Sequence, residues 1–132
     1  MILLIAQALA VQVQLDVDVR KLQVGETTQL RLSVVGGAAD HTPQLKDLPE
    51  LRVDWVGARQ GTVNVNLRNE RVVTYIWNLT ALREGSPVLG PITLSVRGQG
   101  YETNSLQLEV APKVVVETEV LTSNLLDQVW QG

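Results

Sequence analysis

Hydrophobic and polar residues alternate with a period of two along most of this chain. From residue 11 to residue 19 every odd position is apolar and every even position is polar. Such alternation is typical of a β-strand with one buried face. The pattern predicts a strand over residues 11–19 whose odd positions, including Val19, face a hydrophobic core.

The same period predicts further strands in the first half of the chain. Val24-Gly25-Glu26 is a predicted turn, since glycine adopts positive φ at little cost. A strand with Leu30, Leu32 and Val34 inward follows and ends at residues 36–37. The next predicted strand has inward residues Leu51, Val53 and Trp55 and is closed by the glycine-containing residues 57–61.

A hairpin is predicted over residues 62–80. One strand covers 62–67, the polar run of residues 68–71 reverses the chain, and a second strand covers 72–80. In this second strand alternation predicts four inward residues: Val73, Tyr75, Trp77 and Leu79. Ile76 is predicted to be exposed, and single exposed apolar residues are common on protein surfaces.

The last two predicted strands follow a polar connection that contains Arg83, Glu84 and Gly85. The first contains Ile92, Leu94 and Val96, and a tight turn at residues 98–100 leads from it to Tyr101. The last contains Leu106, Leu108 and Val110. Residues 36–49 have no period and form a predicted loop, with Leu45 and Leu48 capping the core.

Seven short strands with frequent turns and no amphipathic helix predict an all-β fold. The expected architecture is an immunoglobulin-like β-sandwich of about seven antiparallel strands, over residues 11–111.

The two ends of the chain are expected to lie outside this domain. Residues 2–10 are apolar and end in Ala8-Leu9-Ala10, which predicts a signal peptide over residues 1–10, although the positively charged n-region is missing. The alternative for this run is a buried first strand. Residues 112–132 are expected to be a linker and the first strand of a truncated second domain, or else a strand added to the edge of the first; residues 123–130 alternatively form a helical turn.

Composition excludes several classes of function. The chain has 132 residues, which is one domain, and no cysteine, so disulfides, a thiol nucleophile and zinc thiolate sites are excluded. Its 11 basic and 14 acidic residues are scattered, which argues against nucleic acid as a partner. No nucleotide-binding motif is present, and we expect no cofactor.

Candidate chemistry is sparse. The one histidine, His41, is a predicted loop residue without a recognisable nucleophile motif nearby. Asp16 and Asp18, with Glu117 and Glu119, are conceivable Ca²⁺ ligands, but they lack the loop that usually supplies six to eight oxygens. Trp55 and Trp77 are predicted to be core residues rather than a sugar-stacking platform, whereas Tyr101 is expected to be partly exposed.

An ordered series of short motifs over residues 11–111 resembles the bacterial BatD-type oxygen-tolerance (aerotolerance) proteins. The series contains these residues: Val24, Gly25, Glu26, Tyr75, Trp77, Arg83, Glu84, Gly85, Gly90, Pro91, Tyr101 and Asn104. The passage from Arg-Glu-Gly to Gly-Pro, followed by Tyr-x-Thr-Asn, is its most specific part.

The resemblance implies an exported envelope protein with tandem immunoglobulin-like domains in the periplasm. It implies von Willebrand A-type Bat proteins and, indirectly, a MoxR-type AAA+ ATPase as partners, a link to oxidative or envelope stress, and no catalytic residues. Family members continue to a C-terminal transmembrane anchor, and this sequence contains no such stretch.

We therefore expect a non-enzymatic protein-interaction module without a small-molecule substrate. Its contacts are expected at the edges of the first and last strands or on the loop of residues 36–49. The alternative is a carbohydrate-binding or cell-wall-binding module that uses exposed aromatic residues.

Overall fold

The computed structural model describes residues 11–113, and within them it contains strands and no helix. There are ten strands. In chain order they are β1 (Gln12–Val17), β2 (Lys21–Gln23), β3 (Thr27–Val35), β4 (Leu51–Val65), β5 (Arg68–Ala81), β6 (Val88–Leu89), β7 (Thr93–Val96), β8 (Gln99–Glu102), β9 (Leu106–Gln107) and β10 (Glu109–Ala111). For these residues the prediction of an all-β fold is confirmed.

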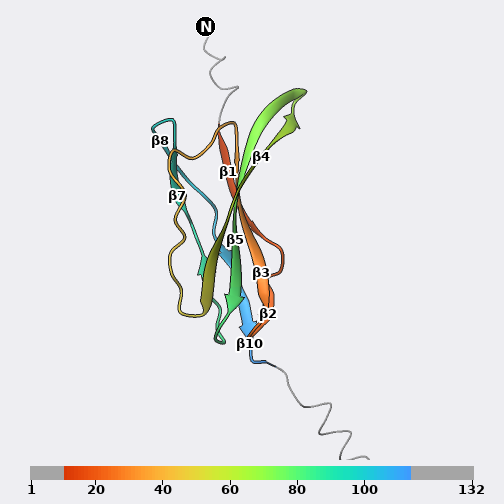
Figure 1. Cartoon of the computed structure of the whole chain (residues 1–132), viewed down its shortest axis with the longest axis vertical. Helices are drawn as coiled ribbons and strands as arrows, with labels where there is room; N and C mark the ends of the chain where they lie inside the picture. Colours follow the sequence, from red (N-terminus) through yellow and green to blue (C-terminus); the bar gives the residue numbers. More distant parts are fainter. Residues whose placement is uncertain (1–10, 114–132) are drawn as a thin grey trace, which may run out of the picture.

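One antiparallel sheet of four strands forms the first layer, in the order β1-β3-β5-β4 (Figure 1). Alternation fixes its register, because a shift by one residue would turn every apolar side chain to the wrong face. Leu30 therefore lies opposite Trp77, and Leu32 opposite Tyr75. All four side chains point to the core.

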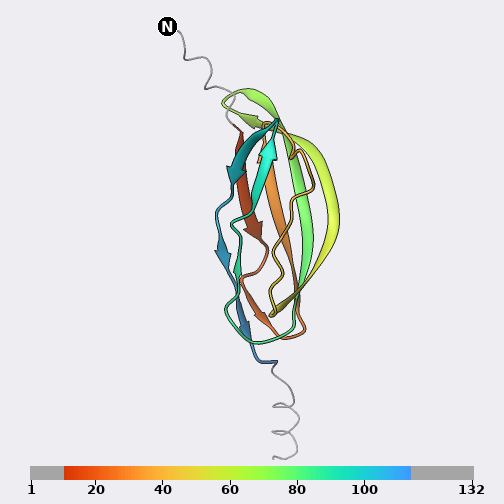
Figure 2. The same cartoon turned by 90° about the vertical axis from the view of Figure 1, so that its left-hand side faces the viewer.

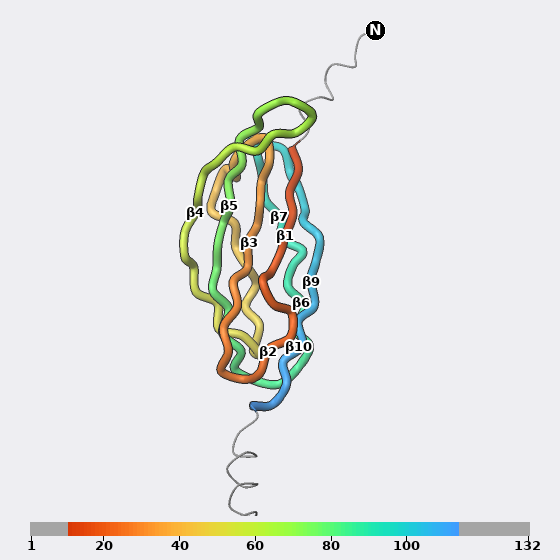
Figure 3. Tube along the Cα trace, turned by 90° about the vertical axis from the view of Figure 1, so that its right-hand side faces the viewer, coloured from red at the N-terminus to blue at the C-terminus, as the bar shows by residue number. Residues whose placement is uncertain are grey.

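The second layer is made of short strand pairs (Figure 2). β6 pairs with β9, and β7 pairs with β8. At the end where the described chain leaves the molecule, β2 pairs in parallel with β10 (Figure 3). The N-terminal segment thus begins in the first layer as β1 and joins the second layer as β2.

The core between the layers is mainly leucine and valine. Its fully buried side chains come from both layers: Leu15, Leu30, Leu32, Val34, Leu79, Leu89, Val96 and Leu108. Leu45 and Leu48 pack against this core from the loop of residues 36–49, as predicted. Tyr101 is partly exposed, also as predicted.

The region of residues 51–80 differs from its prediction in two ways. The two strands expected over 51–55 and 62–67 are one strand, β4, with a bulge between Trp55 and Gly57. The hairpin turn lies at Asn66 and Leu67, which both have positive φ, and the expected turn of residues 68–71 belongs to β5. Gly57 and Gly61 were misread as a strand end, whereas here Gly57 forms the bulge and Gly61 continues the ladder.

Ile76 was predicted to be exposed and is buried. It faces away from the core cluster, and its partners in the sheet are Arg31 on β3 and Gly57 on β4. A central strand is flanked on both sides, so its outer face is partly covered by neighbouring side chains.

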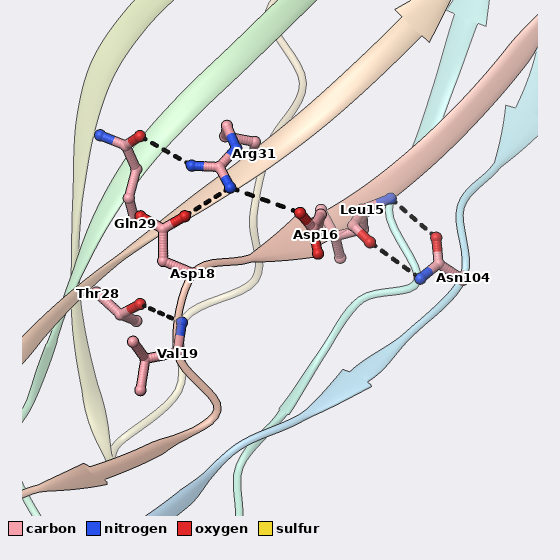
Figure 4. Close-up of polar contacts among 8 residues, drawn as sticks. All are labelled: Leu15, Asp16, Asp18, Val19, Thr28, Gln29, Arg31 and Asn104. Atoms are coloured by element: carbon pink, nitrogen blue, oxygen red, sulfur yellow. Dashed lines mark hydrogen bonds and ion pairs between the residues drawn. The ribbon is translucent and has the colours of Figure 1, made fainter.

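The predicted first strand ends earlier than expected. β1 stops at Val17, Val19 is exposed rather than in the core, and the Val19 N–H donates to Thr28 Oγ1 at 3.1 Å (Figure 4). Leu22, which follows the predicted first strand and precedes the predicted turn, is buried on β2. The chain needs this break because it changes layers between β1 and β2.

The described residues contain ten strands rather than about seven, since the second layer is divided into short pairs. In the part that the structure describes, no helix is long and apolar enough to cross a membrane. The predicted signal peptide and the predicted elements beyond residue 113 lie outside the described residues.

Candidate functional site

Asn104 joins the second layer to the free side of β1 (Figure 4). Its Oδ1 accepts a hydrogen bond from the Leu15 N–H at 2.8 Å, and its Nδ2 donates to the Leu15 carbonyl at 3.1 Å. A single amide thereby satisfies both backbone groups of one edge residue, as a neighbouring strand would. The Asn104 side chain therefore holds the second layer against β1.

The neighbouring motif residues complete this junction. Thr103 is buried, and its Oγ1 accepts from the Ile92 N–H at 2.9 Å and donates to the Asn104 carbonyl at 2.8 Å. Gly90 has a φ of 77°, and a Cβ there would lie 3.0 Å from both the Asn104 carbonyl oxygen and Leu15 Cδ2. The Gly-Pro-Ile and Tyr-x-Thr-Asn passages therefore meet in one packed structural contact.

The Val24-Gly25-Glu26 turn is held in a comparable way. Gly25, with a φ of 98°, donates its N–H to the Ala81 carbonyl at 2.8 Å, and the Ala81 N–H donates to the Glu26 carbonyl at 2.9 Å. Val24 donates to the Ala111 carbonyl at 3.0 Å. This motif connects the first layer to the last strand.

The Arg83-Glu84-Gly85 connection contributes through its backbone. The N–H of Gly85 donates to the Val110 carbonyl at 3.1 Å, and the Val110 N–H donates back at 2.8 Å. The side chains of Arg83 and Glu84 are exposed. β10 therefore has β2 on one side and Gly85 on the other, which leaves little of its backbone for another strand.

Asp16 and Asp18, considered above as Ca²⁺ ligands, are paired with an arginine instead (Figure 4). Arg31 Nη2 lies 2.6 Å from Asp18 Oδ1 and 3.5 Å from Asp16 Oδ2. The hydrogen bond to Asp18 raises the pKa of Arg31, although partial burial acts in the opposite direction. Residues 11–113 contain no group of three or more acidic or histidine side chains placed to hold a metal ion.

The loop of residues 36–49 is fixed by several hydrogen bonds near its beginning. The Ala39 N–H donates to the Tyr75 hydroxyl at 2.9 Å. The Asp40 carboxylate accepts from the N–H groups of Arg97 at 2.8 Å and Gly98 at 2.9 Å, at the turn between β7 and β8. Both hydrogen bonds lower the pKa of the Asp40 carboxyl, and the one from Gly98 has the larger effect. His41 is exposed beside this contact.

Trp55 does not lie in the core, contrary to its prediction. It is opposite Trp77 in the sheet, yet 47% of its surface is exposed, against 4% for Trp77. Its ring makes an edge contact with the ring of Trp77, with 5.4 Å between the ring centroids, and stacks on the ring of Tyr75, with 6.3 Å between the centroids. Because β4 is an edge strand, the core covers only one side of the ring.

A hollow of about 350 Å³ lies between Trp55 and the loop of residues 36–49. Apolar and polar side chains share its lining: Thr42, Pro43, Gln44, Leu45, Asp47, Val53, Trp55 and Trp77. It is therefore a shallow site with an aromatic wall and a few hydrogen-bonding groups at its rim.

The open side of β4 is the most distinctive surface of the described domain. Within residues 11–113 only β5 pairs with β4, so the other side of this 15-residue strand is open. Several large apolar side chains on β4 and its turn are exposed: Trp55, Val56, Val63 and Leu67. Long edges with exposed apolar residues are templates for pairing with another strand.

Charges of opposite sign lie at the two ends of β4. Residues 47–54 contain Asp47, Glu50 and Asp54 against Arg52, which is paired with Asp54 at 3.1 Å. The hairpin end carries two exposed arginines, Arg68 and Arg71, against Glu70. The hairpin reaches beyond the rest of the sheet at one end of the molecule (Figure 1).

Sequence reasoning missed this edge because it divided β4 at its glycines. One signal was present: residues 57–61 contain no Pro, Asp, Asn or Ser, which turns usually require.

Comparison with known proteins adds one match. A family model described as a BatD DUF11-like domain matches residues 15–110, which include β2 to β9 entirely, the second half of β1 and most of β10. No curated protein matches the chain.

Proposed function

Because the chain belongs to the BatD family, we propose that its domain is a non-enzymatic protein-interaction module of an envelope protein. In this proposal the domain is an immunoglobulin-like unit located in the periplasm. Its partners are other envelope proteins, among them von Willebrand A-type Bat proteins, and through these a MoxR-type AAA+ ATPase. The resemblance of the motifs supports these partners and a role in oxygen tolerance.

The observation that carries the proposal is the open β4 edge. An unpaired edge offers backbone donors and acceptors to an incoming strand, while side chains such as Trp55 and Val56 supply apolar contact. By contrast, Leu15 on the opposite edge is already bound by Asn104. β4 is therefore the favoured position for strand addition.

The arrangement of polar groups supports a non-enzymatic role. The family motif residues Gly90 and Asn104 bind the layers together, and the Val24-Gly25-Glu26 turn does the same at the other end. His41 is exposed on its loop, and the adjacent Asp40 carboxylate is occupied as an acceptor for backbone N–H groups.

A lysine on the β4 edge tests this role. We expect Val56→Lys to reduce recovery of von Willebrand A-type proteins in affinity purification from envelope extract, since edge lysines oppose strand pairing. Val88→Lys is the matched control, because Val88 on β6 is exposed to a similar extent, 49% against 46%. Equal recovery with both variants, or no such protein with the wild type, would contradict the proposal.

The alternative function is carbohydrate or cell-wall binding at the hollow beside Trp55. The half-exposed ring and the polar rim of Gln44 and Asp47 favour it, since sugars stack on aromatic faces and bind amides and carboxylates. Titration with soluble peptidoglycan fragments should then change tryptophan fluorescence in the wild type and not in Trp55→Ala. Unchanged wild-type emission would exclude this function.

A further inference from the structure

We propose that β4 pairs with the β4 strand of a second copy of this chain, antiparallel and about a twofold axis between Val56 and Gly57. The inference rests on the proposed function, in which β4 is a strand-adding edge, and it names one partner for that edge. Three features of the strand indicate a self-complementary surface.

The first feature is the placement of one acidic and one basic residue around the bulge. Asp54 lies opposite Asn78 and Arg59 lies opposite Thr74, so both side chains are on the outer face of the sheet. They are equally far in sequence from the proposed axis. Antiparallel pairing about this axis places Asp54 of each copy opposite Arg59 of the other, so the symmetric contact contains two opposite-charge pairs.

The bulge makes this register possible. In a regular strand, residues 54 and 59 would face opposite sides, because they are separated by an odd number of positions. The extra residue between Trp55 and Gly57 restores them to the same face. The ion pair of Asp54 with Arg52 is exposed and leaves room for a second cation on the carboxylate.

The second feature is the inner face at the same position. The register places Trp55 of one copy opposite Ala58 of the other, and both residues face the core side of their own sheets. Ala58 is exposed and has only a methyl side chain, so it leaves room for a large ring on this face. The half-exposed Trp55 ring can therefore lie over the small residues of the second strand.

The third feature is the charge at the two ends. Antiparallel pairing places the end of β4 that follows Asp47 in one copy beside the hairpin end of the other, which carries Arg68 and Arg71. A parallel arrangement would place like charges together instead. Charge complementarity therefore favours the antiparallel direction for a second copy.

Sedimentation equilibrium of the full chain, over a series of micromolar to millimolar concentrations, tests the inference. We expect the wild type to form a reversible dimer. Asp54→Arg and Arg59→Asp should each weaken it by about tenfold or more, since each turns two attractive pairs into repulsive ones. Glu102→Arg on β8 is the control and should leave the dimer unchanged.

Combining the two charge reversals distinguishes pairing from loss of folding. A mixture of Asp54→Arg chains with Arg59→Asp chains should dimerise, because both pairs become attractive again. The double variant Asp54→Arg/Arg59→Asp should also recover the dimer. Circular dichroism verifies that each variant keeps its strands.

Several outcomes would overturn the inference. The first is a wild type that stays monomeric at every concentration. The second is a dimer whose stability is unchanged by Asp54→Arg and by Arg59→Asp, and the third is a mixture of these two variants that does not associate. Amide hydrogen exchange adds a fourth: the β4 amides that point away from β5 should be protected only at high concentration, and protection of these amides at every concentration would mean that another part of the chain covers the edge. If the chain is monomeric but Val56→Lys still prevents partner capture, self-pairing is wrong and the proposed function stands.

Discussion

At the scale of single residues, Asn104 shows how a family motif acts through the fold. Its amide replaces a neighbouring strand at Leu15, with one bond accepted and one donated. The Thr103 hydroxyl and the close approach at Gly90 fix the segment that presents this amide. The motif residues thus specify the junction of two layers, and nothing in their geometry requires a ligand.

We predict that Asn104→Ala lowers the free energy of unfolding by about 1–2 kcal/mol, because two backbone groups of Leu15 lose their partners. Asn104→Asp, which keeps the acceptor and loses the donor, should fall between the wild type and Asn104→Ala. Urea unfolding measures both. The control is Gln107→Ala, which removes an exposed amide on β9 and should have little effect on stability. If Asn104→Ala had as little effect as this control, Asn104 would have no structural role.

Asp40 gives a prediction about pH. The pKa of its carboxyl is lowered in the folded protein by the N–H groups of Gly98 and Arg97. A lowered folded pKa means that the stabilisation is complete above the unfolded pKa and is lost as pH falls through the folded pKa. The stability difference between wild type and Asp40→Asn should therefore shrink as pH falls below about 4.

Urea midpoints measured from neutral pH to about pH 3 provide the test of Asp40. A difference between the two proteins that is independent of pH would show that the carboxylate charge does not hold the turn between β7 and β8.

At the scale of elements, the two glycines of β4 differ only in backbone conformation. Gly57 has a φ of 149° at the bulge, whereas Gly61 has no positive φ, and a Cβ would meet no atom within 4 Å at either position. The bulge therefore depends on a glycine at position 57, and the strand beyond it does not depend on one at position 61.

We predict that Gly57→Ala destabilises the domain by about 1–3 kcal/mol, since it forces an L-residue into a strained region. Gly61→Ala should be neutral or stabilising by up to about 1 kcal/mol, because alanine restricts the unfolded chain more than glycine does. Thermal unfolding of the two variants measures the contrast. Equal effects would mean that the bulge is not maintained by backbone strain.

At the scale of the whole molecule, the two layers depend on each other. The second layer consists of strands of two to four residues, too short to be stable without a packed face. Leu108 lies fully buried between β9 and β10 and belongs to the shared core. We expect the described domain to unfold in one cooperative transition.

Leu108→Ala should accordingly lower the free energy of unfolding by about 2–5 kcal/mol, through lost burial and a cavity. Leu82→Ala, at an exposed leucine, should change it by less than about 0.5 kcal/mol. Intrinsic fluorescence and far-ultraviolet circular dichroism during urea unfolding should give the same midpoint for Leu108→Ala. Two separate midpoints would show that the layers unfold independently.

The sequence by itself determined the strands whose side chains alternate strictly, because alternation is a local property of a half-buried strand. This is why the inward positions of β3 and β5 were predictable from Leu30, Leu32, Tyr75 and Trp77. The motif residues also identified the family without reference to any contact. What they do, such as the binding of Leu15 by Asn104, was not visible, since the two residues are far apart in the chain.

Only the tertiary structure decided which strands lie at an edge. The alternation that places Trp55 toward the core is real, but among residues 11–113 β4 has a neighbouring strand on one side only, so the ring is half exposed. Ile76 is buried for the converse reason, because β5 is a central strand with a neighbour on each side. Edge and centre are properties of the assembled sheet, and the candidate site at β4 exists because of that order.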